Sequence, residues 1–125
     1  MQKSVLLTSA LFGAIMLAPA AQAMSSSECA VLSAQLNKTA MQLSKENAAL
    51  KSEKVTIDEF GYEVDDAVEQ ANFSAEHNAR AIELKAEFDE LKIDYNARLN
   101  ALSAKASEFT VKKQTFDSEC KTTKK

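Results

Sequence analysis

The fold is decided by residues 36–64, which read LNKTAMQLSKENAALKSEKVTIDEFGYEV. An apolar residue stands at every seventh position of this stretch, and the row consists of Leu36, Leu43, Leu50, Ile57 and Val64. The row extends back to Cys29 and forward to Ala71. A sustained seven-residue repeat keeps one face of a helix against a neighbouring helix over many turns. The stretch therefore predicts a long helix that packs along its length against a second helix.

A second row with the same spacing follows a short polar gap, and it is largely aromatic. Its members are Ala81, Phe88, Tyr95, Leu102, Phe109 and Phe116. If the chain folds back between the two rows, the position numbers of facing residues must add to a constant, and pairing Leu36 with Phe116 gives 152 for every pair along both rows. The sequence therefore predicts an all-α fold, a long antiparallel two-helix hairpin of the coiled-coil kind, with these two rows as its helix–helix seam.

Local signals place the ends of the two helices. Ser25 and Glu28 have the spacing of a capping box, which predicts a first helix over about 26–71. A polar bend follows at about 72–76, and Ser74 is a suitable N-cap for a second helix over about 75–119. The sequence TIDE at residues 56–59 is a second capping-box pattern and leaves open a break near 54–56. Because the apolar row crosses that point without losing phase, a continuous or mildly bent helix is favoured.

Residues 1–23 have the features of a secretory signal peptide. Lys3 supplies a positive start, an apolar segment follows, and Ala21-Gln22-Ala23 is a small-residue cleavage site. The apolar segment is shorter than the roughly 20 residues that cross a bilayer. Cleavage would leave one domain, a hairpin over 24–120, followed by a basic tail over 121–125. We therefore expect an exported protein that is periplasmic or secreted.

The two cysteines, Cys29 and Cys120, are expected to form a disulfide bond. They lie near opposite ends of the predicted hairpin, and their numbers add to 149, which is within one helical turn of the register that the apolar rows set. An even number of cysteines in an exported protein is typical of disulfide pairing. The bond would staple the base of the hairpin, where the two chain ends meet.

Charge is distributed unevenly along the predicted rod. Residues 58–94, around the bend, contain twelve acidic and three basic residues, a net charge of −9, whereas residues 24–57 and 95–125 together carry +5. An acidic tip could bind a basic protein; its candidate residues are Asp58, Glu59, Glu63, Asp65, Asp66 and Glu69. A basic base could contact anionic lipid or cell-wall polymer; its candidate residues are Lys112, Lys113, Lys121, Lys124 and Lys125. Solvation of two charged helix faces is the plainer explanation of both clusters.

The sequence offers little for catalysis. It has a single histidine, His77, in the predicted bend, and it lacks a glycine-rich loop or a nucleophile motif. We expect no enzyme activity, cofactor, metal site, small-molecule substrate or nucleic-acid partner. The favoured function is a structural or protein-interaction module, with a protein partner or self-association. Two alternatives stay open: a holdase-type periplasmic chaperone that grips unfolded clients through the aromatic row, and a binder of the envelope surface.

Overall fold

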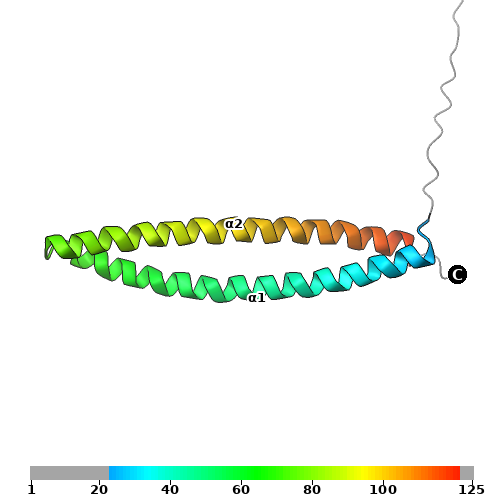
Figure 1. Ribbon diagram of the computed structural model, residues 1–125, viewed down its shortest axis with the longest axis horizontal. Helices are drawn as coiled ribbons and strands as arrows, with labels where there is room; N and C mark the ends of the chain where they lie inside the picture. Colours follow the sequence, from blue (N-terminus) through cyan, green and yellow to red (C-terminus); the bar gives the residue numbers. More distant parts are fainter. Residues whose placement is uncertain (1–22, 122–125) are drawn as a thin grey trace, which may run out of the picture.

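The structure, a computed structural model, describes residues 23–121 and consists there of two antiparallel helices. Helix α1 spans Ser26–Gln70 and helix α2 spans Ala75–Glu119, each with 45 residues. They lie side by side as a long thin rod, with the bend at one end and the start of α1 and the end of α2 at the other (Figure 1). The predicted all-α hairpin is confirmed. The predicted signal peptide and residues 122–125 lie outside the described residues.

Side-chain caps explain where each helix begins. The Ser25 side chain accepts a hydrogen bond from the Glu28 amide at 3.3 Å, and the Ser25 amide donates to Glu28 at 2.7 Å, which completes the capping box. The Ser74 hydroxyl accepts from the His77 amide and starts α2. Helix α1 continues through residues 54–56 without a break. There the Thr56 hydroxyl donates to the carbonyl of Ser52 at 3.4 Å, so its side chain bonds within the helix instead of capping a new one.

The core of the rod is a thin line between the helices. Its buried residues are Leu36, Leu50, Ile57, Val64, Ala81 and Leu102, and all of them belong to the two seven-residue rows. The other seam residues are half-buried: Leu43, Phe88, Tyr95, Phe109 and Phe116. Two helices alone cannot enclose a side chain from every direction, which explains why no described side chain is completely buried.

A disulfide bond closes the base of the hairpin. Cys29 and Cys120 are joined, with their Cα atoms 5.7 Å apart, as the sequence predicted. Further along the rod, Gly61 faces Phe88, because a Cβ atom built on this glycine would lie 3.2 Å from the Phe88 ring. Phe60 also contacts that ring, with the centroids 6.1 Å apart. The missing side chain of Gly61 therefore makes room for an aromatic ring in the seam.

The contacting pairs also refine the register. The numbers of paired residues add to 151 for Glu46 with Lys105 and for Glu53 with Arg98, to 149 for Cys29 with Cys120 and to 148 for Phe60 with Phe88, so all four pairs lie within a few residues of the constant of 152 from the rows. The physical reason is that seam residues interdigitate: a side chain from one helix fits between residues of the other, and does not stand directly opposite one of them.

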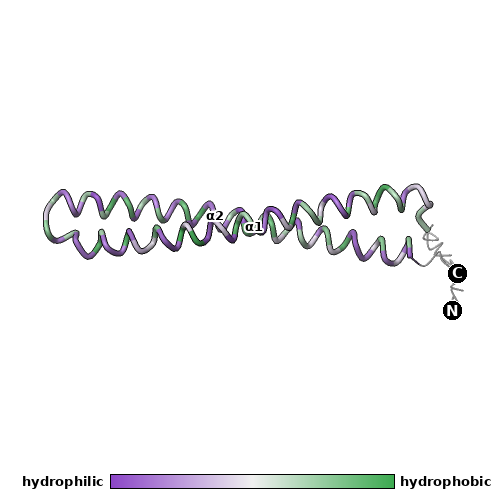
Figure 2. The backbone as a smooth tube through the Cα atoms, turned by 90° about the horizontal axis from the view of Figure 1, so that it is seen from below, coloured by the Kyte–Doolittle hydropathy of each residue, from purple (hydrophilic) through white to green (hydrophobic). Residues whose placement is uncertain are grey.

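The positions three residues after each seam residue form a second line of contact between the helices, and this line is polar in the middle of the rod. The Lys105 ammonium group donates to both carboxylate oxygens of Glu46 at 2.9 Å, and Arg98 pairs with Glu53. Along both helices short hydrophobic segments alternate with hydrophilic ones (Figure 2). Hydrophobic packing on one side of the seam and ion pairs on the other thus hold the helices together.

Candidate functional site

The acidic tip is exposed in the structure. All six candidate residues have exposed side chains, and two of them form ion pairs. Asp58 binds Lys54 on the same helix at 2.6 Å, and Glu63 binds Arg80 on α2 at 3.2 Å. Among the described residues, the other four have no cationic partner: Glu59, Asp65, Asp66 and Glu69. The tip therefore presents uncompensated negative charge to solvent.

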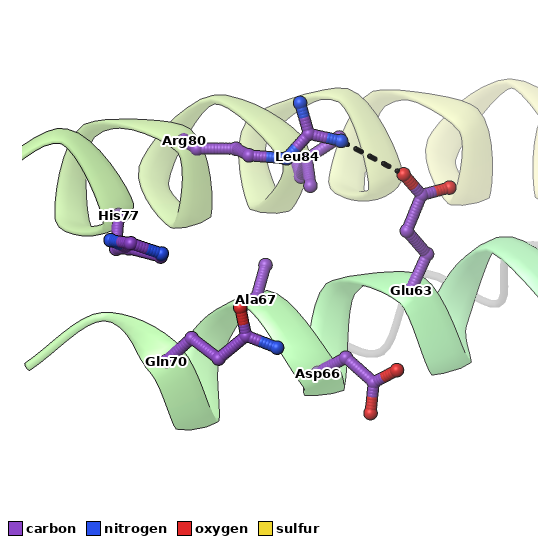
Figure 3. A pocket seen from close by; sticks show the side chains of 7 residues that line it. All are labelled: Glu63, Asp66, Ala67, Gln70, His77, Arg80 and Leu84. Atoms are coloured by element: carbon purple, nitrogen blue, oxygen red, sulfur yellow. Dashed lines mark hydrogen bonds and ion pairs between the residues drawn. The ribbon is translucent and has the colours of Figure 1, made fainter. Parts of the chain in front are cut away.

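A shallow hollow lies across the two helices near the bend. It encloses about 170 Å³ and lies between Asp66 and Gln70 on α1 and His77 and Arg80 on α2. The ion pair between Arg80 and Glu63 borders it (Figure 3). Acidic, basic and amide groups line this hollow together, so it could accept a polar side chain of a partner protein.

His77 is part of the cap of α2. Its Nδ1 atom lies 2.7 Å from the Ser74 hydroxyl, and its ring stands edge-on to Phe73 at 6.0 Å. Within residues 23–121, no group of three or more histidine, cysteine, aspartate or glutamate residues is arranged to hold a metal ion. The contacts of His77 account for its position in the bend.

One carboxylate partly neutralises the cluster of lysines at the disulfide-bonded end of the hairpin. Asp117 pairs with Lys113 at 3.1 Å and with Lys121 at 2.6 Å, and these two ammonium groups lower the pKa of Asp117. Lys112 borders two grooves between the helices and has no ion pair among the described residues. Lys124 and Lys125 lie outside the described residues. Part of the positive charge expected at the base is thus already paired with Asp117.

The aromatic row that a chaperone would use is half-buried in the seam. Phe88 packs against Gly61 and Phe60, and Lys92 covers its ring at 4.6 Å from the centroid. Tyr95, Phe109 and Phe116 are also half-buried. The exposed large apolar side chains lie elsewhere, and Phe73 at the bend is 75% exposed. This arrangement gives the aromatic row a packing role in the hairpin.

Sequence reasoning missed the ion pairs between the helices. No partner was predicted from the sequence for Glu46 or for Glu53, which pair with Lys105 and Arg98 in the structure. The signal was present, because Lys105 and Arg98 occupy the equivalent positions of the second row, three residues after Leu102 and Tyr95. The numbers of both pairs add to 151, one less than the constant of 152, so a search for cations within one residue of that register would have found both contacts.

Comparison with known proteins identifies no matching family model, curated protein or solved structure. Neither described helix contains a stretch long and apolar enough to cross a membrane. The disulfide bond fits an extracellular or otherwise oxidising compartment.

Proposed function

We propose that this protein is an exported structural or protein-interaction module without catalytic activity. The observation that carries the proposal is the separation of charge along a disulfide-closed rod, with a net charge of −9 over residues 58–94 around the bend and +3 over residues 24–57 and 95–121. Like charges gathered at one end repel each other and cost stability. Their retention is explained if the charged tip binds a partner of opposite charge, such as a basic segment of another protein.

The geometry of the tip supports this function. Four carboxylates there lack an internal partner, and the neighbouring hollow has both a donor, Arg80, and acceptors. The exposed ring of Phe73 lies next to these charges in the chain and can add apolar contact area. Aromatic side chains are enriched in protein–protein interfaces, whose rims are polar.

Site-specific photo-crosslinking tests the proposal. A photoreactive phenylalanine analogue replaces Phe73 at the bend, and in a matched control it replaces Val111, which is exposed on α2 near the base. In cells that export the protein, we expect Phe73 to form a discrete adduct with another protein and Val111 to form none. Loss of the adduct when Asp65 and Asp66 are changed to asparagine would support charge recognition. If neither position gives a discrete adduct, the tip is not a binding surface.

A further inference from the structure

The part of the hairpin next to the disulfide bond differs from the rest of the rod. This base segment comprises residues 29–43 of the first arm and 109–120 of the second. In the described part of the chain, the ion pairs that join α1 to α2 all lie between the base segment and the bend: Glu46 with Lys105, Glu53 with Arg98 and Glu63 with Arg80. Within its described residues, the base segment therefore has no ion pair across the two helices.

The residues that face each other in the base segment explain this difference. The two central ion pairs have position numbers that add to 151. In the next layer toward the base, the same register pairs Thr39 with Lys112, and in the layer after that it pairs Leu32 with Glu119. Threonine has no charge to offer a lysine, and leucine has none to offer a glutamate. Two grooves, of about 390 and 280 Å³, are both lined by Thr39 and Lys112, so the helices fit together loosely at this layer.

Apolar packing in the base segment is thin as well. Within residues 29–43 and 109–120, Leu36 is the one buried side chain. The rings of Phe109 and Phe116 are half-buried. Few contacts therefore remain to hold this segment closed when the disulfide bond is absent.

We propose that the disulfide bond makes the base segment a redox-sensitive switch. Reduction opens the hairpin as far as the pair of Glu46 with Lys105, whereas the helices stay paired from there to the bend. The open form exposes Leu36, Phe109 and Phe116 to solvent. The inference goes beyond the proposed function, because it concerns the opposite end of the rod from the acidic tip and does not depend on what the tip binds.

Thiol–disulfide exchange with a dithiol reductant accounts for the opening. A thiolate of the reductant attacks the Sγ atom of Cys120 and breaks its bond to Cys29, which leaves as a thiolate. Cys29 is the better leaving group because it lies in the first turn of α1, where the helix dipole stabilises negative charge, whereas Cys120 caps the end of α2. The second thiol of the reductant then attacks the mixed disulfide and releases Cys120. Two electrons and two protons pass to the cysteines, and the reductant ends as a disulfide. Exchange with a disulfide oxidant reverses these steps and closes the segment.

Amide hydrogen exchange of the full exported chain, oxidised or reduced with dithiothreitol, tests the proposal. In the reduced protein we expect the amides of residues 29–43 and 109–119 to exchange about ten-fold faster or more, because an opened segment loses its protection. The amides of residues 50–64 and 88–102 should keep their rates within about three-fold. Reoxidation with oxidised glutathione should restore the slow rates. Unchanged rates after reduction, or equal acceleration along the whole of both helices, overturns the inference.

A variant tests whether the missing ion pair is what lets the segment open. Thr39→Glu places a carboxylate opposite Lys112 and continues the line of ion pairs by one layer toward the disulfide bond. We expect the acceleration on reduction to be smaller in this variant by about two-fold or more, which is the effect of one exposed ion pair.

Asn37→Glu is the matched control for this variant. Asn37 is exposed and borders neither groove, and asparagine and threonine have similar helix propensities. The control adds the same charge to the base segment without a partner on α2, so we expect the acceleration on reduction to equal that of the unchanged protein. Equal acceleration in the two variants would overturn the inference.

Discussion

At the residue scale, Gly61 has a packing role. A Cβ atom at this position would lie 3.2 Å from the half-buried Phe88 ring, so the ring would have to shift by a few tenths of an ångström. Gly61→Ala would also gain about 1 kcal/mol of helix propensity, so we expect a stability change within about 1 kcal/mol. The larger side chain of Gly61→Leu needs more space than such a shift provides. We expect it to lower the free energy of unfolding, measured with denaturant, by about 1–3 kcal/mol.

The Gly61 prediction includes a test of its cause. If the loss comes from the clash with the ring, Gly61→Leu should cost much less in a Phe88→Ala background, because the two changes share one space. An equal loss in both backgrounds would mean that Phe88 is not what constrains this position.

Asp117 gives a prediction of pH dependence at the base. Hydrogen bonds from Lys121 and then Lys113 lower its pKa below the usual value of 3.8. A carboxyl whose pKa is lower in the folded state stabilises the fold above pH 3.8, and this contribution is lost as the pH falls through the lowered pKa. We expect a carboxyl NMR titration to show the lowered pKa, and to show it rising toward 3.8 in Lys113→Gln with Lys121→Gln. Lys112→Gln is the control, and an equal rise there would contradict the assignment.

At the scale of elements, the ion pairs between α1 and α2 limit the stability of the seam. The pair of Glu46 with Lys105 is about half exposed, and such pairs contribute roughly 0.2–1 kcal/mol. Two leucines in their place would bury apolar surface at a seam position, with a gain of roughly 1.5–3 kcal/mol for each side chain that becomes fully buried. We expect Glu46→Leu with Lys105→Leu to raise the stability by about 1–3 kcal/mol in thermal or denaturant unfolding.

The control for the seam prediction lies on the outer side of α2. Asn96→Leu with Ser103→Leu adds comparable apolar surface at exposed positions and should leave the stability nearly unchanged. If the two leucines at positions 46 and 105 lower the stability of the protein, the prediction is wrong. The ion pair of Glu46 with Lys105 then stabilises the hairpin more than an apolar contact between the same two positions, and it fixes the alignment of the helices there.

The fold could be predicted from the sequence because each helix repeats one simple pattern. The seam residues recur at every seventh position, Ser25 and Ser74 supply caps, and the two cysteines lie at the same end. The contact partner of each seam side chain could not be predicted, because interdigitation depends on side-chain shape, which number matching ignores. The candidate surfaces were predicted only as clusters of charge, since the sequence does not show which of those charges are neutralised within the hairpin, as happens at Asp117.

At the scale of the whole molecule, the disulfide bond compensates for the small core. Among the described residues, the hairpin buries only a thin line of side chains between its helices. The bond joins residues 91 positions apart. In the chain-entropy model, closing such a long loop lowers the entropy of the unfolded chain and adds about 4–5 kcal/mol to the free energy of unfolding. That amount is a large part of the total stability of a small domain.

Removal of the bond should therefore weaken the rod from its base. We expect the double variant Cys29→Ser with Cys120→Ser to have a free energy of unfolding, measured with denaturant, that is about 4–5 kcal/mol lower than that of the oxidised protein. Amide hydrogen exchange should accelerate first near Cys29 and Cys120 and last near the bend, because the short link still holds the helices together there. If the variant keeps its stability and that stability rises with protein concentration, association between copies is what holds the helices together. Stability retained at every concentration would mean that the seam alone suffices, and that the bond serves to fix the position of the ends.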